Sequence, residues 1–280
     1  METWPIGVFT SLDAGLGVKL EVAQELDVPT IHLHAPAPKS RTPEQALAFL
    51  KKLKAAGIRI TVVFGGFEGE SYADIPTVER TVGLVPRKTR VARVREMKEI
   101  SDFTTMLACD AVGLHLGFVP HDPADPLYSE ALDLTRDLCD HCRQNGQGLH
   151  LETGQETAET LARFITDVER PNLFINFDPA NMILYGAGEP IAALEVVGRW
   201  VRSVHCKGAT WAKSPGKEWG VETPLGAGAV GFDKFLRALK KIGYLGPLTI
   251  EREIPQDPTR QKAEIGHAVT LLTKLKAEIL

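Results

Sequence analysis

The sequence has few cysteines, a small net charge and no long apolar run. Four cysteines in 280 residues are too few for a disulfide framework. A formal net charge of −4 gives no general attraction to nucleic acid or anionic lipid. No apolar stretch approaches the ~20 residues that cross a bilayer, and the N-terminus lacks a basic segment followed by an apolar one. We therefore expect a cytoplasmic protein with a small-molecule partner and neither a nucleic-acid nor a membrane partner.

Short apolar runs alternate with helical patterns about eight times, which is typical of a parallel α/β fold. The expected strands lie near residues 5–10, 30–35, 58–64, 111–116, 148–152, 172–178, 203–207 and 247–252. The expected helices lie near 15–27, 43–56, 87–108, 127–145, 157–169, 189–201, 231–242 and 258–279. A (β/α)8 TIM barrel typically needs ~250 residues. Because no linker separates the units, we predict one TIM barrel domain over residues 1–280.

Four expected strands end in a residue that can bind a metal ion. These residues are Glu152, Asp178, His205 and Glu251. In a barrel of parallel strands all such ends face the same mouth, so the four side chains can converge on one divalent ion. Three carboxylates and one imidazole suit Mn²⁺, Mg²⁺ or Co²⁺ better than a thiolate-preferring ion, and Zn²⁺ is an alternative. The pattern predicts a metal-dependent enzyme.

Two long connections interrupt the alternation, near residues 65–86 and 208–230. Long strand-to-helix loops of a barrel usually line or cover its site. The second connection contains Trp211 and Trp219, whose rings can stack on a sugar or can pack as part of a plain lid. The basic segment Arg87–Arg95 is interpreted as a solvated helix face, with phosphate contact as the alternative.

The strand-end segments resemble those of the sugar phosphate isomerase/epimerase superfamily, which has a xylose-isomerase-like TIM barrel. The most specific segments are Leu151–Glu156, Asn176–Met182, Val204–Lys207 and Leu248–Glu253. The resemblance implies one divalent metal, usually Mn²⁺, bound by the four strand-end residues. It also implies that the two glutamates exchange the substrate proton.

The implied chemistry explains why two carboxylates accompany a metal. A metal that holds a carbonyl oxygen and a neighbouring hydroxyl stabilises the charge of an enediolate. Glu152 or Glu251 can then remove a proton from one face of the carbon while the other glutamate returns it to the opposite face. The expected reaction is isomerisation or epimerisation of a sugar or sugar derivative.

The sequence departs from the ketose 3-epimerase pattern at two positions that help to hold substrate in those enzymes. Asn181 stands where a histidine is common, and Trp211 stands where an arginine is common. A different polyol, keto-sugar or inositol derivative is therefore a candidate substrate. Inosose dehydratases share this barrel and metal site, so dehydration is an alternative reaction. A non-catalytic sugar-binding protein is the alternative of another class, and a homo-oligomer is left open.

Other residues near the expected mouth have weaker signals for substrate binding. His34 and His115 end strands and can line the pocket, or can be hydrogen-bonded core histidines. Glu156 can bind a substrate hydroxyl or can cap the helix that follows. Lys207 can contact a substrate oxygen or can form a salt bridge. With Asn181 and Trp211, these residues complete the expected substrate site.

Overall fold

The barrel is built from eight parallel strands in the described part of the chain. The computed structural model describes residues 3–12 and 16–280. The barrel strands are β1 (Ile6–Ser11), β2 (Thr30–His34), β3 (Arg59–Phe64), β4 (Ala111–Leu114), β5 (Gly148–Glu152), β6 (Leu173–Phe177), β7 (Val201–Cys206) and β10 (Leu248–Ile250). They follow the order β1-β10-β7-β6-β5-β4-β3-β2, and β10 closes the barrel by pairing with β1.

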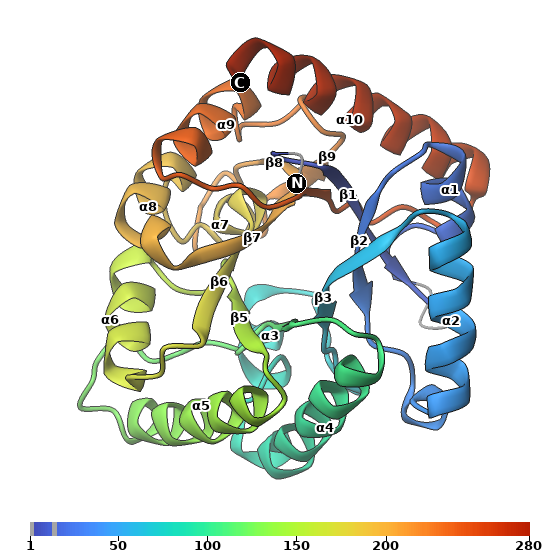
Figure 1. The fold of residues 1–280 in the computed structure, drawn as a ribbon. Coiled ribbons are helices and arrows are strands. Elements are labelled where there is room, and N and C mark those ends of the chain that lie inside the picture. The colour runs from blue at the N-terminus through green and yellow to red at the C-terminus, as the bar shows by residue number, and fades with distance from the viewer. Residues whose placement is uncertain (1–2, 13–15) are drawn as a thin grey trace.

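Helices surround this ring of strands (Figure 1). They are α1 (Leu20–Glu25), α2 (Pro43–Ala55), α3 (Ile75–Thr81), α4 (Arg87–Met106), α5 (Pro126–Gln144), α6 (Ala158–Val168), α7 (Pro179–Tyr185), α8 (Pro190–Val197), α9 (Phe232–Lys241) and α10 (Pro258–Ile279). Two strands outside the barrel, β8 (Gly208–Thr210) and β9 (Val221–Thr223), form an antiparallel pair. None of the helices described combines the length and apolar character that crossing a bilayer requires.

The predicted TIM barrel is confirmed, and the differences lie in short elements. The helix expected over 15–27 is observed over Leu20–Glu25, and residue 15 is outside the described residues. Three further features were not predicted from the sequence: α3, α7 and the β8-β9 pair. Each of these helices and strands has seven residues or fewer, which is too short for a hydrophobic period to be recognised.

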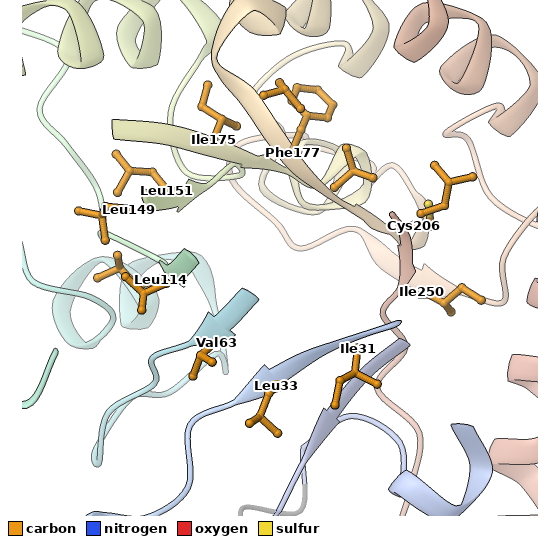
Figure 2. Close-up of a cluster of buried hydrophobic side chains, with 14 of the residues drawn as sticks. Ile31, Leu33, Val63, Leu114, Leu149, Leu151, Ile175, Phe177, Cys206 and Ile250 are labelled. Carbon is orange, nitrogen blue, oxygen red and sulfur yellow. The ribbon is translucent and has the colours of Figure 1, made fainter. Parts of the chain in front are cut away.

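The main hydrophobic core lies between the strands and the surrounding helices. Figure 2 shows buried side chains on the outer side of the barrel strands, among them Ile31, Leu114, Leu149, Ile175 and Cys206. Alternate residues of a strand point to opposite faces, so the intervening residues face the barrel interior. This alternation places Cys206 in the core and its neighbour His205 inside the barrel.

The basic segment Arg87–Arg95 is not simply a solvated helix face. Arg93 is only 4% exposed, and its guanidinium donates to the backbone oxygens of Thr81 and Gly83 at 2.6 and 2.8 Å. Glu70 accepts a hydrogen bond from the Gly83 N–H at 2.7 Å. Buried charged groups paired with backbone atoms hold a loop in one conformation. Part of the segment therefore anchors the connection after β3 at the barrel mouth.

Candidate active site

The four expected metal ligands lie together at the carboxyl-terminal mouth of the barrel. Glu152 ends β5 and His205 lies in β7, while Asp178 and Glu251 directly follow β6 and β10. One ligand atom from each residue lies within 4.8 Å of the other three. The structure thus brings together the four residues that the strand-end pattern singled out.

The imidazole of His205 contacts all three carboxylates of this cluster. Its Nδ1 lies 2.8 Å from Glu152 Oε1, 3.1 Å from Glu251 Oε2 and 3.9 Å from Asp178 Oδ2. Neighbouring ligands of an octahedral ion bound at ~2.1 Å are about 3 Å apart. The separations therefore suit atoms that share one divalent ion.

Asp178 has one carboxylate oxygen that no protein donor satisfies. Its Oδ1 accepts from the backbone N–H groups of Ala180 and Asn181 at 2.8 and 3.1 Å, which caps α7. Its Oδ2 is buried and has no hydrogen-bond partner. A buried carboxylate is costly unless a cation compensates its charge. This oxygen and the hard donor set around it fit a divalent metal.

Burial and neighbouring charges shift the pKa values of three of these groups. Burial raises the pKa of the Asp178 carboxyl well above its usual range. Burial acts in the same direction on Glu251, but the charges of Lys207 and His205 outweigh it and hold the pKa of Glu251 well below its usual range. Burial would lower the pKa of His205, but Glu152 and Glu251 raise it to about 10. A cation must displace the proton from Nδ1, so its affinity should increase with pH.

His32 contacts the ring nitrogen of His205 that faces away from the carboxylates. His32 Nδ1 lies 3.0 Å from His205 Nε2, and burial lowers the pKa of His32 well below its usual range. A neutral His32 can accept a hydrogen bond from the Nε2–H group of His205, which leaves His205 Nδ1 available to a cation. A role for His32 was not predicted from the sequence. His32 precedes His34 by two residues and therefore lies on the same face of β2.

Other polar side chains hold both glutamates. Asn181 Nδ2 donates to Glu152 Oε1 at 3.2 Å, and His115 Nε2 lies 3.3 Å from Glu152 Oε2. Lys207 Nζ donates to Glu251 Oε2 at 3.2 Å. The salt bridge considered for Lys207 is thus present. Each of the two carboxylates therefore has at least one side-chain contact in addition to His205.

A cavity of about 480 Å³ opens at these glutamates. Four of the expected substrate residues line it: His34, His115, Asn181 and Lys207. A pocket of ~300–1,000 Å³ with convergent polar groups is the usual form of a small-molecule site. The cavity and the candidate metal cluster therefore belong to one site.

Two residues expected at the substrate lie away from this cavity. Glu156 is buried and accepts from the Val119 N–H at 2.9 Å, and burial raises its pKa to about 7. Its suggested role as a helix cap is wrong, because the side chain of Thr157 caps α6. Trp211 is 36% exposed and is absent from the described residues that line the cavity, whereas Trp219 is one of them. We expected Trp211 at the substrate because it stands where an arginine that helps to hold substrate is common in ketose 3-epimerases.

These observations define a (β/α)8-barrel protein with a candidate metal cluster in a concave mouth. The sequence matches the family described as xylose isomerase-like TIM barrel over residues 20–275, and the chain belongs to that family. No curated protein matches the sequence.

Solved structures resemble the whole chain. A xylose isomerase domain protein from Planctomyces limnophilus is 61% identical, with 99% of each chain covered and a TM-score of 0.97. A xylose isomerase-like TIM barrel protein from Mycobacterium smegmatis, solved in complex with magnesium, is 19% identical, with 98% of each chain covered and a TM-score of 0.71. An L-ribulose 3-epimerase is 16% identical, with 98% of this chain and 94% of that chain covered and a TM-score of 0.72. The last two likenesses concern the fold alone.

Proposed function

We propose that the protein is a divalent-metal-dependent isomerase or epimerase of a neutral sugar or sugar derivative. The observation that carries this proposal is the convergence of Glu152 and Glu251 on one atom, His205 Nδ1, at 2.8 and 3.1 Å. The two glutamates come from β5 and from the end of β10, and β6 and β7 lie between those strands. They therefore approach the cavity from different directions, as proton transfer at two faces of one carbon requires.

Each side chain has a distinct task in this reaction. A divalent ion, for which we propose Mn²⁺, would supply Lewis-acid stabilisation of the charge that develops on substrate oxygen. One glutamate removes the proton from the carbon next to the carbonyl, and the other returns a proton to the opposite face of that carbon or to its neighbour. Asn181 and His115 orient the carboxylate of Glu152, and Lys207 orients that of Glu251. Positioned acid-base groups of this kind contribute ~10²–10⁴-fold.

The charges that line the cavity favour a neutral substrate over a phosphorylated one. Lys207 lies 3.2 Å from Glu251 and 3.9 Å from Glu222. Arg252 pairs with Glu222 and Glu264 at 2.5 and 3.0 Å. Both permanently cationic lining residues are thus already paired with carboxylates. A phosphate would have to displace one of these pairs, whereas sugar hydroxyls can bind them in place.

The names of two similar structures support the proposal of a bound divalent metal and a sugar substrate. The Mycobacterium smegmatis barrel was solved with magnesium, and another similar structure is named L-ribulose 3-epimerase. The candidate ligands of the present chain are the four residues Glu152, Asp178, His205 and Glu251.

Solvent isotope exchange tests the reaction. Incubation of the Mn²⁺-loaded protein with free ketoses, keto-sugars and inososes in deuterated water should place deuterium on carbon and give a product of unchanged formula apart from the label. The physical reason is that a glutamic acid can exchange its proton with solvent before returning it. Mass spectrometry measures the label. A heat-inactivated sample is the control, and the absence of any isomer or epimer across this panel would contradict the proposal.

Dehydration is the second candidate reaction. Lys207 Nζ lies 3.2 Å from Glu251 Oε2, so an ammonium group is placed where it can protonate a departing hydroxyl. In that case the same incubations should yield a product lighter by one water as the main species. A non-catalytic binder would give neither product.

Metal loading tests the cofactor separately from the reaction. Chelator-treated protein should take up close to one Mn²⁺ per chain, and its melting temperature should increase with Mn²⁺ or Co²⁺ because the assembled cluster exists only in the folded state. An ion present at 100 times its Kd stabilises the fold by about 2.7 kcal/mol. Elemental analysis and differential scanning fluorimetry give the two readouts. An unchanged melting temperature with each of Mn²⁺, Co²⁺, Mg²⁺ and Zn²⁺ would contradict a metal site.

A further inference from the structure

Three of the aromatic side chains that line the cavity come from segments outside the barrel strands, and we call them the aromatic wall. They are Tyr72, Tyr185 and Trp219. Tyr72 lies in the connection after β3, Tyr185 ends α7, and Trp219 lies between β8 and β9. The Tyr185 and Trp219 rings are 4.5 Å apart at their centroids, and Tyr72 is 47% exposed although it lines the cavity. An exposed aromatic surface inside a binding cavity is available for contact with a ligand.

The backbone holds this wall in place. The Gly220 N–H donates to the Leu184 oxygen at 3.0 Å, which fixes the β8-β9 segment against α7. A Cβ at Gly220 would lie 2.5 Å from the Thr210 oxygen, so only glycine permits this approach. The residue before it, Trp219, is thereby held beside Tyr185. A preorganised aromatic surface loses little entropy when it binds a ring.

Polar contacts connect the aromatic wall to the proposed catalytic carboxylate. His115 Nε2 lies 3.3 Å from Glu152 Oε2, and the Tyr72 ring centroid lies 6.1 Å from that of His115. Gln155 Nε2 lies 3.2 Å from both His115 Nδ1 and the Tyr185 hydroxyl. The imidazole ring of His115 therefore links Glu152 to the aromatic wall. A substituent on a sugar bound at the glutamates can reach it.

The size of the cavity leaves room for such a substituent. Its volume of about 480 Å³ lies within the ~300–1,000 Å³ of pockets that bury drug-sized ligands, which are larger than one sugar ring. Leu184 and Leu16 add apolar surface to the lining. A free monosaccharide at the glutamates would leave this apolar surface in contact with water.

From these observations we propose that the aromatic wall is a second subsite, which binds a ring linked to the reacting sugar. The ligand class is a neutral glycoside that carries a ketone on the reacting ring and whose substituent is a second sugar ring or an aromatic group. This inference rests on the proposed function, because the reacting sugar is placed at Glu152 and Glu251. The substituent presents a flat apolar face to Trp219, which packs on the buried ring of Tyr185, while the hydroxyls of the reacting sugar face the carboxylates.

Matched glycosides test the subsite. Methyl, phenyl and glucosyl glycosides of glucose, galactose and mannose are titrated into the Mn²⁺-loaded protein by isothermal calorimetry. These glycosides lack the ketone and therefore bind without reacting. In at least one configuration the phenyl or glucosyl derivative should bind about tenfold more tightly than the methyl derivative, a difference of about 1.4 kcal/mol, because its ring contacts the aromatic wall. Comparison of the phenyl and glucosyl derivatives shows whether the subsite prefers an aromatic substituent or a second sugar ring.

Substitutions at Trp219 test whether this residue causes the preference. Trp219→Ala should reduce the ratio of methyl to phenyl or glucosyl Kd values to near one, while Trp219→Phe should retain most of it. Trp211→Ala is the matched control, because Trp211 belongs to the same connection but is 36% exposed and absent from the described cavity lining. It should leave the ratio unchanged. Melting temperatures verify that each variant is folded.

The subsite is wrong if no derivative binds more tightly than its methyl partner, or if the preference survives Trp219→Ala. Metal uptake and isotope exchange on unsubstituted keto-sugars do not depend on the aromatic wall. Their success without a glycoside preference would therefore reject the subsite and leave the proposed function intact. A preference that Trp219→Ala removes, in a protein without isotope exchange, would support the subsite and reject the proposed reaction.

Discussion

Replacement of Glu152 by glutamine should lower turnover at least about 100-fold even when Mn²⁺ is in excess, and Glu251→Gln should do the same. The amide keeps one side-chain oxygen that can coordinate weakly, but it cannot accept a proton from carbon. Saturating metal therefore separates loss of the base from loss of the ligand. Steady-state kinetics over a range of Mn²⁺ concentrations measure the effect as kcat, and a fall in kcat at saturating metal identifies a catalytic contribution.

Glu130→Gln provides a control for the loss of one carboxylate elsewhere on the barrel. Glu130 lies on α5 and pairs with Arg87 and Arg90 at 2.7 and 2.5 Å, away from the lining of the cavity in the described residues. Its replacement should leave kcat unchanged. Near-normal kcat in Glu152→Gln or in Glu251→Gln would show that the two-glutamate proton exchange is wrong.

The barrel and its candidate metal cluster were predictable because both depend on local patterns. An apolar run followed by Glu152 or Asp178 marks the end of a buried strand, and parallel strands bring their ends to one mouth. Side-chain alternation along β7 places His205 inside the barrel and Cys206 in the outer core, since neighbouring strand residues face opposite sides. No long-range information was needed for these predictions.

Long-range contacts explain what the sequence did not reveal. The carboxylate of Glu156 bonds to the backbone of Val119, and the guanidinium of Arg93 bonds to that of Thr81. Both charged groups are buried by segments far away in the sequence, so a local reading assigned them to a substrate site and to a solvated face. The two tryptophans differ for a similar reason. Only the packing of the β8-β9 segment on α7 decides that Trp219 lines the cavity.

The largest effect on metal binding is expected for Asp178→Asn. Asparagine also caps helices, so its side-chain oxygen can still accept from the N–H groups of Ala180 and Asn181. The substitution removes the negative charge at the buried Oδ2 but keeps the size of the side chain. We expect at least a ~100-fold weaker affinity for Mn²⁺, because an amide is a poor substitute for a carboxylate ligand. Calorimetric titration of the chelator-treated variant measures the Kd.

Stability without metal should change in the opposite direction, which makes this variant more informative than a deletion to alanine. Burial raises the pKa of Asp178 well above its usual range, so its charged form destabilises the metal-free fold near neutral pH. A neutral amide avoids that cost, and the melting temperature of metal-free Asp178→Asn should equal or exceed that of the wild type. Added Mn²⁺ should then raise the wild-type value but not that of the variant.

Asp257→Asn is a closely matched control for the helix cap. Asp257 caps α10 through N–H groups of Thr259 and Arg260, with φ −103° and ψ 105°, compared with −106° and 107° at Asp178. The same substitution there should leave both Mn²⁺ affinity and the metal-induced increase in melting temperature at wild-type values. Wild-type affinity for Mn²⁺ in Asp178→Asn would exclude Asp178 as a ligand. Equal losses in both variants would attribute the effect to helix capping, because Asp257 is exposed and is absent from the described residues that line the cavity.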